Sequence, residues 1–197
     1  YLFPDVKSLI GTDVNDARFG INPSGDSYIT PAKIKELLDV GSAVTLQANN
    51  DITVQSAIEV NADGDGGDLT LQAGRNITFN ADVTTDNGNL TAIAGDSNAD
   101  QNNRDPGTPI LTINNAILNG GSGTITLAAV DGNFINNNGD SAILTDGGRW
   151  LIYAANPTTS NRGDLSGDNK RYNQAFTQDI VPDYASNGNW FFYSVAP

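Results

Sequence analysis

Apolar and polar residues alternate along much of the chain, in short runs that are separated by Asn, Asp and Gly. The runs at 44–48, 69–73 and 90–94 read VTLQA, LTLQA and LTAIA. Alternation of period two between turn residues is typical of short β-strands with one buried face. Val44, Leu69 and Leu90 fall at equivalent places, 25 and 21 residues apart. Repetition at such a spacing is a signature of solenoid proteins.

Each repeat holds about three short strands, which are too few to bury an apolar face on their own. Stacking each repeat on the one before it produces parallel ladders around a continuous narrow core. The pattern therefore predicts an all-β fold, a right-handed parallel β-helix (solenoid). It also predicts which side chains point inward in stacked rows: Leu69, Leu71, Ile77, Phe79, Leu90, Ile93, Ile125 and Leu127.

The segment 30–41 has the pattern of a short helix instead. Thr30 is placed to cap the N-terminus, Pro31 suits the first helical position, and Gly41 is placed to end the helix. Its apolar residues recur on one face: Ile34, Leu37 and Leu38. We expect this helix to cover the open end or a flank of the solenoid, where unpaired strand edges would invite aggregation.

The chain is predicted to form one domain, 1–197. Residues 1–29 form an N-terminal extension, 42–155 the stacked coils, and 156–197 a C-terminal cap segment. A polar loop inserted at about 97–109 leaves the coil without disturbing the core. Nine of the fifteen aromatic residues lie beyond position 149, and we expect their rings to cover the end of the solenoid.

Several phrases of the repeat resemble those of filamentous-haemagglutinin-like exoproteins, the large bacterial adhesins that are exported by two-partner secretion. The phrases are ANNDITV, GGDLTLQAGRNITF and GNLTAIAG, with TPAKIKELLDVGSAVTLQA before them and GRWLIYAANP after them. The resemblance runs from about Tyr28 to Pro197. It implies a secreted segment, extracellular or on the bacterial cell surface, that acts as a rigid stalk or interaction module. It also implies an outer-membrane transporter as a partner of the parent protein, and a host or cell-surface receptor or glycan.

Composition narrows the function classes. A net charge of −13 with only ten Lys and Arg argues against nucleic acid, which needs a clustered basic footprint. The chain has no cysteine, histidine or methionine, so thiol chemistry, imidazole bases and the usual zinc ligands are excluded. No run of 18 apolar residues predicts a membrane span. The start at Tyr1, with no leader-like pattern, predicts an excised or processed piece of a longer protein.

One turn has the composition of a calcium site. Asp63, Asp65 and Asp68 alternate with glycines in the stretch 61–68, and such spacing lets oxygen ligands converge on a hard cation. The bidentate Glu of an EF-hand loop is missing, and a solvated wide turn between two strands explains the same residues. Calcium is the one cofactor that the sequence suggests.

Two other functions stay open beside the stalk. Parallel β-helices also support carbohydrate-active enzymes of the lyase or hydrolase type, which place acids and bases together in a cleft. The acidic residues here sit mostly at turns, so the sequence predicts no enzyme and no catalytic residue. The third class is an extracellular filament subunit that assembles with its own kind through the solenoid ends.

Two remaining patterns have both a functional and a structural interpretation. Between positions 149 and 172, basic residues lie near aromatic ones in the sequence: Arg149, Arg162, Lys170 and Arg171 with Trp150, Tyr153 and Tyr172. This mixture could bind an anionic glycan or a partner protein. It is also typical of a terminal segment whose rings pack inward and whose charges point outward. Asn-x-Thr sequons begin at Asn76 and Asn89, inside strand phrases, where the alternation of turn and strand residues produces the same letters.

Overall fold

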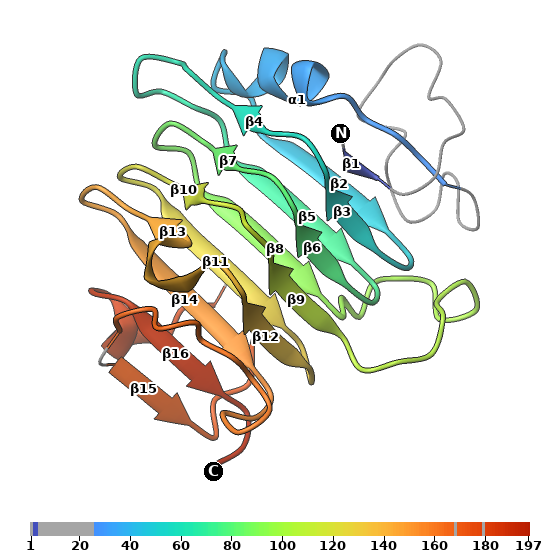
Figure 1. Ribbon diagram of the computed structural model, residues 1–197, viewed down its shortest axis with the longest axis vertical. Helices are drawn as coiled ribbons and strands as arrows, with labels where there is room; N and C mark the ends of the chain where they lie inside the picture. The colour runs from blue at the N-terminus through green and yellow to red at the C-terminus, as the bar shows by residue number, and fades with distance from the viewer. Residues whose placement is uncertain (1, 4–25, 168, 179) are drawn as a thin grey trace.

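Figure 1 shows a computed structural model of the chain, which describes residues 2–3, 26–167, 169–178 and 180–197. The predicted extension 1–29 lies almost wholly outside the described residues. The described part is mostly β, with parallel sheets and one α-helix, α1 (Pro31–Leu38). Two 3₁₀ turns, η2 (Gly139–Ser141) and η3 (Asp183–Ala185), lie in connections. The all-β class with parallel ladders and one short helix is confirmed at this level.

The strands of the described residues form three sheets. The long sheet contains, in spatial order, β2 (Val44–Ala48), β5 (Leu69–Ala73), β8 (Leu90–Ala94), β11 (Thr124–Ala129), β14 (Arg149–Ala154), β16 (Trp190–Tyr193) and β15 (Asn169–Tyr172). The five-stranded sheet contains β1 (Leu2–Phe3), β3 (Ile52–Val54), β6 (Ile77–Phe79), β9 (Ile110–Ile113) and β12 (Asn133–Asn136). The four-stranded sheet contains β4 (Ile58–Glu59), β7 (Val83–Thr84), β10 (Leu118–Asn119) and β13 (Ile143–Leu144).

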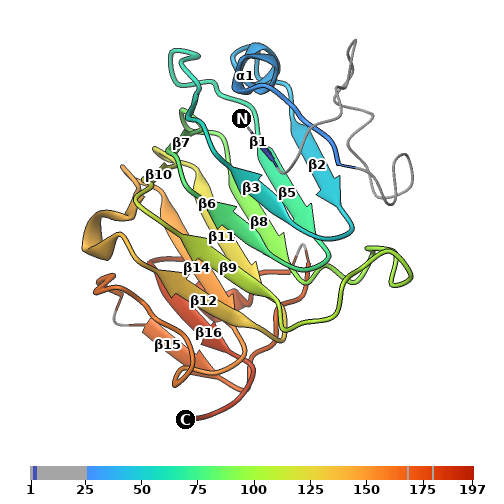
Figure 2. The ribbon, with the colours of Figure 1, turned by 45° about the vertical axis from the view of Figure 1, so that its right-hand side comes forward.

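The chain visits these sheets in rotation, from the long sheet to the five-stranded and then the four-stranded one. From β2 to β13 this rotation is completed four times, and each new strand pairs in parallel with its counterpart from the turn before (Figures 1 and 2). Val44 pairs with Leu69, and Leu69 pairs with Leu90. The equivalence predicted from the repeat is therefore confirmed residue by residue.

The core lies between the three sheets. Seven of the eight side chains predicted to point inward are buried in it: Leu69, Leu71, Ile77, Phe79, Leu90, Ile125 and Leu127. The prediction for Ile93 was wrong. Ile93 is only 2% exposed, but it belongs to a second apolar cluster on the outer face of the long sheet. The inward residues of β8 are Leu90, Ala92 and Ala94. Ile93 alternates with them along the strand and therefore points outward, in register with Gln72.

Helix α1 covers the beginning of the stack, as expected. The Thr30 hydroxyl accepts a hydrogen bond from the Lys33 amide (3.3 Å), which caps the first turn, and Pro31 occupies the first position. Ile34 and Leu38 are fully buried in the core, and the helix contacts β4 and β2. In the five-stranded sheet the outer edge of β3 is covered by β1, which pairs with it in antiparallel fashion.

Asn and Asp side chains fasten each turn to the next. The Asp51 carboxylate accepts a hydrogen bond from the Asn76 amide N–H (3.0 Å), and the Asn76 side chain accepts one from the Ile110 N–H (3.0 Å). In the same way the Asp68 carboxylate accepts from the Asn89 N–H (2.8 Å). These contacts satisfy N–H groups at strand starts, which explains why the turns favour Asn and Asp.

The loop at 97–109 connects β8 to β9 and projects from the side of the sheets (Figure 1), and hydrogen bonds join it to an earlier turn. The Asp100 N–H donates to the Asn49 side-chain oxygen (2.9 Å), and the Asp105 N–H donates to that of Asn50 (2.6 Å). The loop is thus hydrogen-bonded to the turn that follows β2, two coils earlier than its own starting strand.

Candidate functional site

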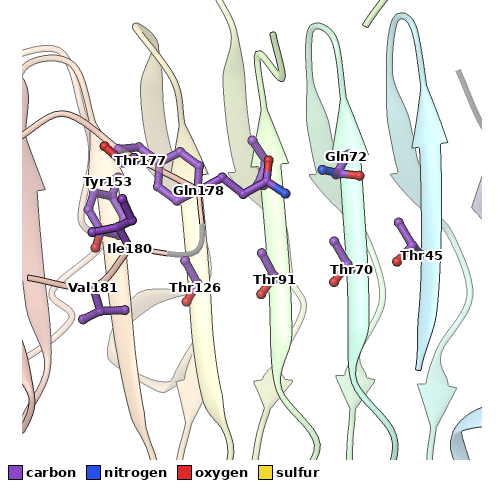
Figure 3. A pocket seen from close by; sticks show the side chains of 12 residues that line it. Thr45, Thr70, Gln72, Thr91, Thr126, Tyr153, Thr177, Gln178, Ile180 and Val181 are labelled. Atoms are coloured by element: carbon purple, nitrogen blue, oxygen red, sulfur yellow. The ribbon is translucent and has the colours of Figure 1, made fainter. Parts of the chain in front are cut away.

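A groove of about 270 Å³ lies on the outer face of the long sheet, where the C-terminal part of the chain crosses the strands. The crossing segment, residues 173–178 and 180–189, connects β15 to β16 and is called the strap below. Figure 3 shows a row of threonine side chains on the strands and, beside it, strap residues Gln178, Ile180 and Val181. The strands therefore supply a floor of regularly repeated side chains, and the strap supplies a wall that has no such repeat.

The floor carries four threonines, one from each of four neighbouring strands: Thr45, Thr70, Thr91 and Thr126. The ladder pairs each with the next in register, so their hydroxyls recur at the strand spacing of about 4.8 Å. None of the four hydroxyls has a hydrogen bond to another residue in the described part of the chain. Their side chains therefore leave a line of available donors and acceptors.

A second outward column runs beside the threonines. It begins with Gln47 and Gln72, whose side chains are joined by a hydrogen bond from Gln47 Nε2 to Gln72 Oε1 (2.8 Å). Gln72 is only 4% exposed, and its amide nitrogen has no hydrogen bond to another described residue. In Figure 3 this nitrogen faces the Gln178 side chain of the strap.

The same column becomes apolar further along the sheet, and there the strap packs. Tyr153 stacks on Phe192 with ring centroids 4.4 Å apart and meets Phe176 of the strap edge-on at 5.1 Å. Burial raises the pKa of the Tyr153 phenol to about 12. Arg149 donates a hydrogen bond to the Ala185 carbonyl of η3, which also fastens the strap. The wall of the groove is therefore fixed by an aromatic cluster.

The structure places the predicted calcium ligands in the turn between β4 and β5, where Asp63, Asp65 and Asp68 are exposed. The turn between β7 and β8 holds this turn in place, because the Asp86 carboxylate accepts hydrogen bonds from the Ala62 N–H (2.6 Å) and the Gly64 N–H (3.0 Å). Within the described residues no three His, Cys, Asp or Glu side chains are grouped to hold a metal ion. Calcium binding stays a prediction.

The basic residues of the C-terminal region do not gather at one site. The guanidinium of Arg162 lies over the Phe191 ring at 5.1 Å, and that of Arg171 lies over the Tyr184 ring at 5.2 Å. Lys170 is exposed on the edge strand β15. The rings also divide, since Trp150 belongs to the inner core and Tyr153 to the outer cluster.

A cluster of opposite charges holds the loop at 97–109. Arg75 pairs with Asp51 (2.6 Å) and with Asp105 of the loop (3.5 Å). The hydrogen bond to Asp51 raises the pKa of the Arg75 guanidinium above its usual value. This group lies away from the groove, whose lining contains no charged side chain among the described residues.

Comparison of the chain with known protein families, with curated proteins and with solved structures finds no match. In the described ranges, no helix combines the length and the apolar character that crossing a membrane requires.

The groove was not predicted from the sequence, although part of its signal is visible there. Three of the outward threonines are the central residues of LTL and LTA and the second threonine of TITL. The strap left no such signal, because its contacts with Tyr153 and Ile93 depend on how the chain crosses the sheet.

Proposed function

We propose that the chain is a rigid stalk or interaction segment of a secreted bacterial cell-surface exoprotein, built as a right-handed parallel β-helix. The observation that carries the proposal is the in-register parallel stacking of β2, β5, β8, β11 and β14, with strands of two further sheets added in rotation. Parallel connections between strands of one sheet are right-handed in nearly all proteins, which supports the handedness.

Several features support a mechanical role. Each turn contacts its neighbours through backbone ladders and stacked side chains, so stability accumulates along one axis. The Asn and Asp side chains of the turns add hydrogen bonds along the same axis. Such a stack resists bending, and its polar outer surface is free to carry variable loops.

The resemblance of the repeats to filamentous-haemagglutinin-like exoproteins supports an adhesive setting and export by two-partner secretion. The stalk is favoured over the filament subunit because α1 and β1 cover the beginning of the stack. It is favoured over the carbohydrate-active enzyme because the described residues that line the groove are uncharged and offer no pair of acids to a substrate.

The location is tested by labelling intact bacteria that produce the parent protein with antibodies raised against this chain. We expect labelling of unpermeabilised cells or recovery in the culture medium, and loss of both when the cognate outer-membrane transporter is deleted. Labelling that requires lysis of the cells contradicts the proposal.

The stalk itself is tested by pulling the chain between its ends in single-molecule force measurements. Because each turn unfolds against its neighbour, we expect stepwise extension in increments of one turn. A single event at low force contradicts a mechanical role. Both experiments use the wild-type chain and need no knowledge of the receptor.

A further inference from the structure

We propose that the groove on the long sheet binds an extended, uncharged glycan chain, which lies across the strands along the threonine row. This inference rests on the proposed function as an adhesive segment and adds a ligand class and a site to it. Three independent features of the groove carry the inference: its neutrality, its unpaired polar groups and its linear repeat.

The neutrality is unusual for this protein. The chain carries a net charge of −13, yet the described residues that line the groove are all Thr, Gln, Tyr, Phe, Ile and Val. Among these described lining residues a charged ligand would find no ion-pair partner, and an anionic one would also meet the field of the acidic surface. The occupant that fits is polar but uncharged.

The unpaired polar groups point to hydrogen bonding with a ligand. The Gln72 side chain is 4% exposed, its oxygen is taken by Gln47, and its amide N–H groups have no described partner. Because this donor faces the Gln178 side chain across the groove, a ligand in the groove can offer it an acceptor. Sugar hydroxyl oxygens supply acceptors, and the Gln178 amide across the groove supplies a second contact.

The repeat gives the ligand its direction. Thr45, Thr70, Thr91 and Thr126 each add one hydroxyl and one methyl group at the strand spacing of about 4.8 Å. Ile180 and Val181 form an apolar wall opposite them, and both are exposed. A pyranose chain has polar edges and apolar ring faces, and so matches a hydroxyl row on one side and an aliphatic wall on the other. An extended peptide would bind best through a sheet edge, which this face does not offer.

The test is isothermal titration calorimetry of the purified chain with cellohexaose and with chitohexaose, two uncharged hexasaccharides. We expect at least one of them to bind. The double variant T70V/T91V should weaken that binding about ten-fold or more, because two hydrogen bonds to the ligand are removed while shape is kept. Gln178→Ala, at an exposed strap position, should weaken it as well.

The matched control is T78V/T112V. Thr78 and Thr112 pair in register on the five-stranded sheet and do not line the groove, so binding should be unchanged. Melting curves of all variants verify that each is folded. A hexamer of galacturonic acid should bind more weakly than the neutral probes.

The inference is overturned if neither neutral hexasaccharide binds at millimolar concentration, or if T78V/T112V weakens binding as much as T70V/T91V. It is also overturned if an uncharged peptide of Ser, Thr and Asn binds with the same dependence on Thr70 and Thr91 while the sugars do not. Each of these results leaves cell-surface labelling and stepwise unfolding unaffected, so failure of the glycan site is distinguishable from failure of the stalk.

Discussion

The two ends of the long sheet carry the same ladder but opposite outer faces. At β2 and β5 the outward positions are Thr and Gln, whereas at β14 and β16 the corresponding positions are Leu151, Tyr153, Trp190 and Phe192. The polar end faces the open groove, and the apolar end is covered by the strap. The difference teaches that the inner face of the repeat builds the common core, while the outer face decides where another segment of the chain packs.

Removing the cover at the apolar end should have the largest effect. Deletion of residues 189–197 eliminates β16, which pairs with both β14 and β15. Trp150 and Tyr153 would then lose their ring partners Phe191 and Phe192. We expect the last coils to unfold or the protein to aggregate, as measured by melting, solubility and sedimentation.

For comparison, deletion of part of the loop at 97–109 should leave the C-terminal coils folded, with a smaller loss of stability from its contacts to Asn49, Asn50 and Arg75. Unchanged melting, solubility and sedimentation after the terminal deletion would rule out the covering role of β16.

The second-largest effect is expected from truncation of an inward side chain at the polar end of the long sheet. Leu71 is fully buried between Leu46 and Ala92 of the neighbouring strands, so Leu71→Ala should cost roughly 2–5 kcal/mol of unfolding free energy. Thr70→Ala, on the outer side of the same strand, should cost about 1 kcal/mol or less. Urea unfolding of both variants measures the difference, and equal losses would contradict the assignment of the two faces.

The tight stacking of turns gives a third test. An added Cβ at Gly88 would overlap the Gly67 carbonyl oxygen of the turn before, and one at Gly123 would overlap that of Gly88. Gly88→Ala should therefore destabilise the protein by about 1–3 kcal/mol.

Gly147 is the matched control for Gly88, since no atom lies within 4 Å of its added Cβ, although its φ of 80° makes alanine mildly strained. If chemical denaturation finds Gly147→Ala more damaging than Gly88→Ala, close stacking does not limit the side chains allowed in these turns.

The aromatic cluster predicts a pH dependence that the polar end lacks. Tyr153 has a pKa of 10.0 as a free side chain and about 12 in the fold, because burial disfavours the phenolate. Its contribution to stability is complete below pH 10 and is lost as the pH rises from 10 through 12.

Tyr153→Phe should therefore flatten the alkaline part of the stability curve, as followed by fluorescence-detected urea unfolding between pH 9 and pH 12. Since burial also raises the pKa of Tyr193, some alkaline loss should remain in the variant. An unaltered curve would show that Tyr153 is accessible to solvent.

The smallest expected effect concerns calcium at Asp63, Asp65 and Asp68. If these carboxylates bind the ion in the native state, calcium raises the melting temperature and Asp65→Asn removes most of that rise. Asp146, which is also exposed and lies in the corresponding turn three repeats further on, between β13 and β14, offers a control position for Asp→Asn. Calorimetry that detects no binding at millimolar calcium would leave the turn as a purely structural feature.

The amino-acid sequence by itself determined the ladder. Period-two alternation and the 25- and 21-residue spacing were enough to align Val44, Leu69 and Leu90, and capping chemistry was enough to place α1. These features could be predicted because they depend on local spacing and on residues that favour turns.

Tertiary structure alone decided what covers the outer face. Ile93 has the same apolar character as its inward neighbours, and no local rule says that it meets the strap some eighty residues later in the chain. The insertion of β16 between β14 and β15 likewise reverses the order of the chain. The groove depends on both, because its floor follows from the repeat and its wall comes from a segment whose position is fixed only by long-range packing around Tyr153.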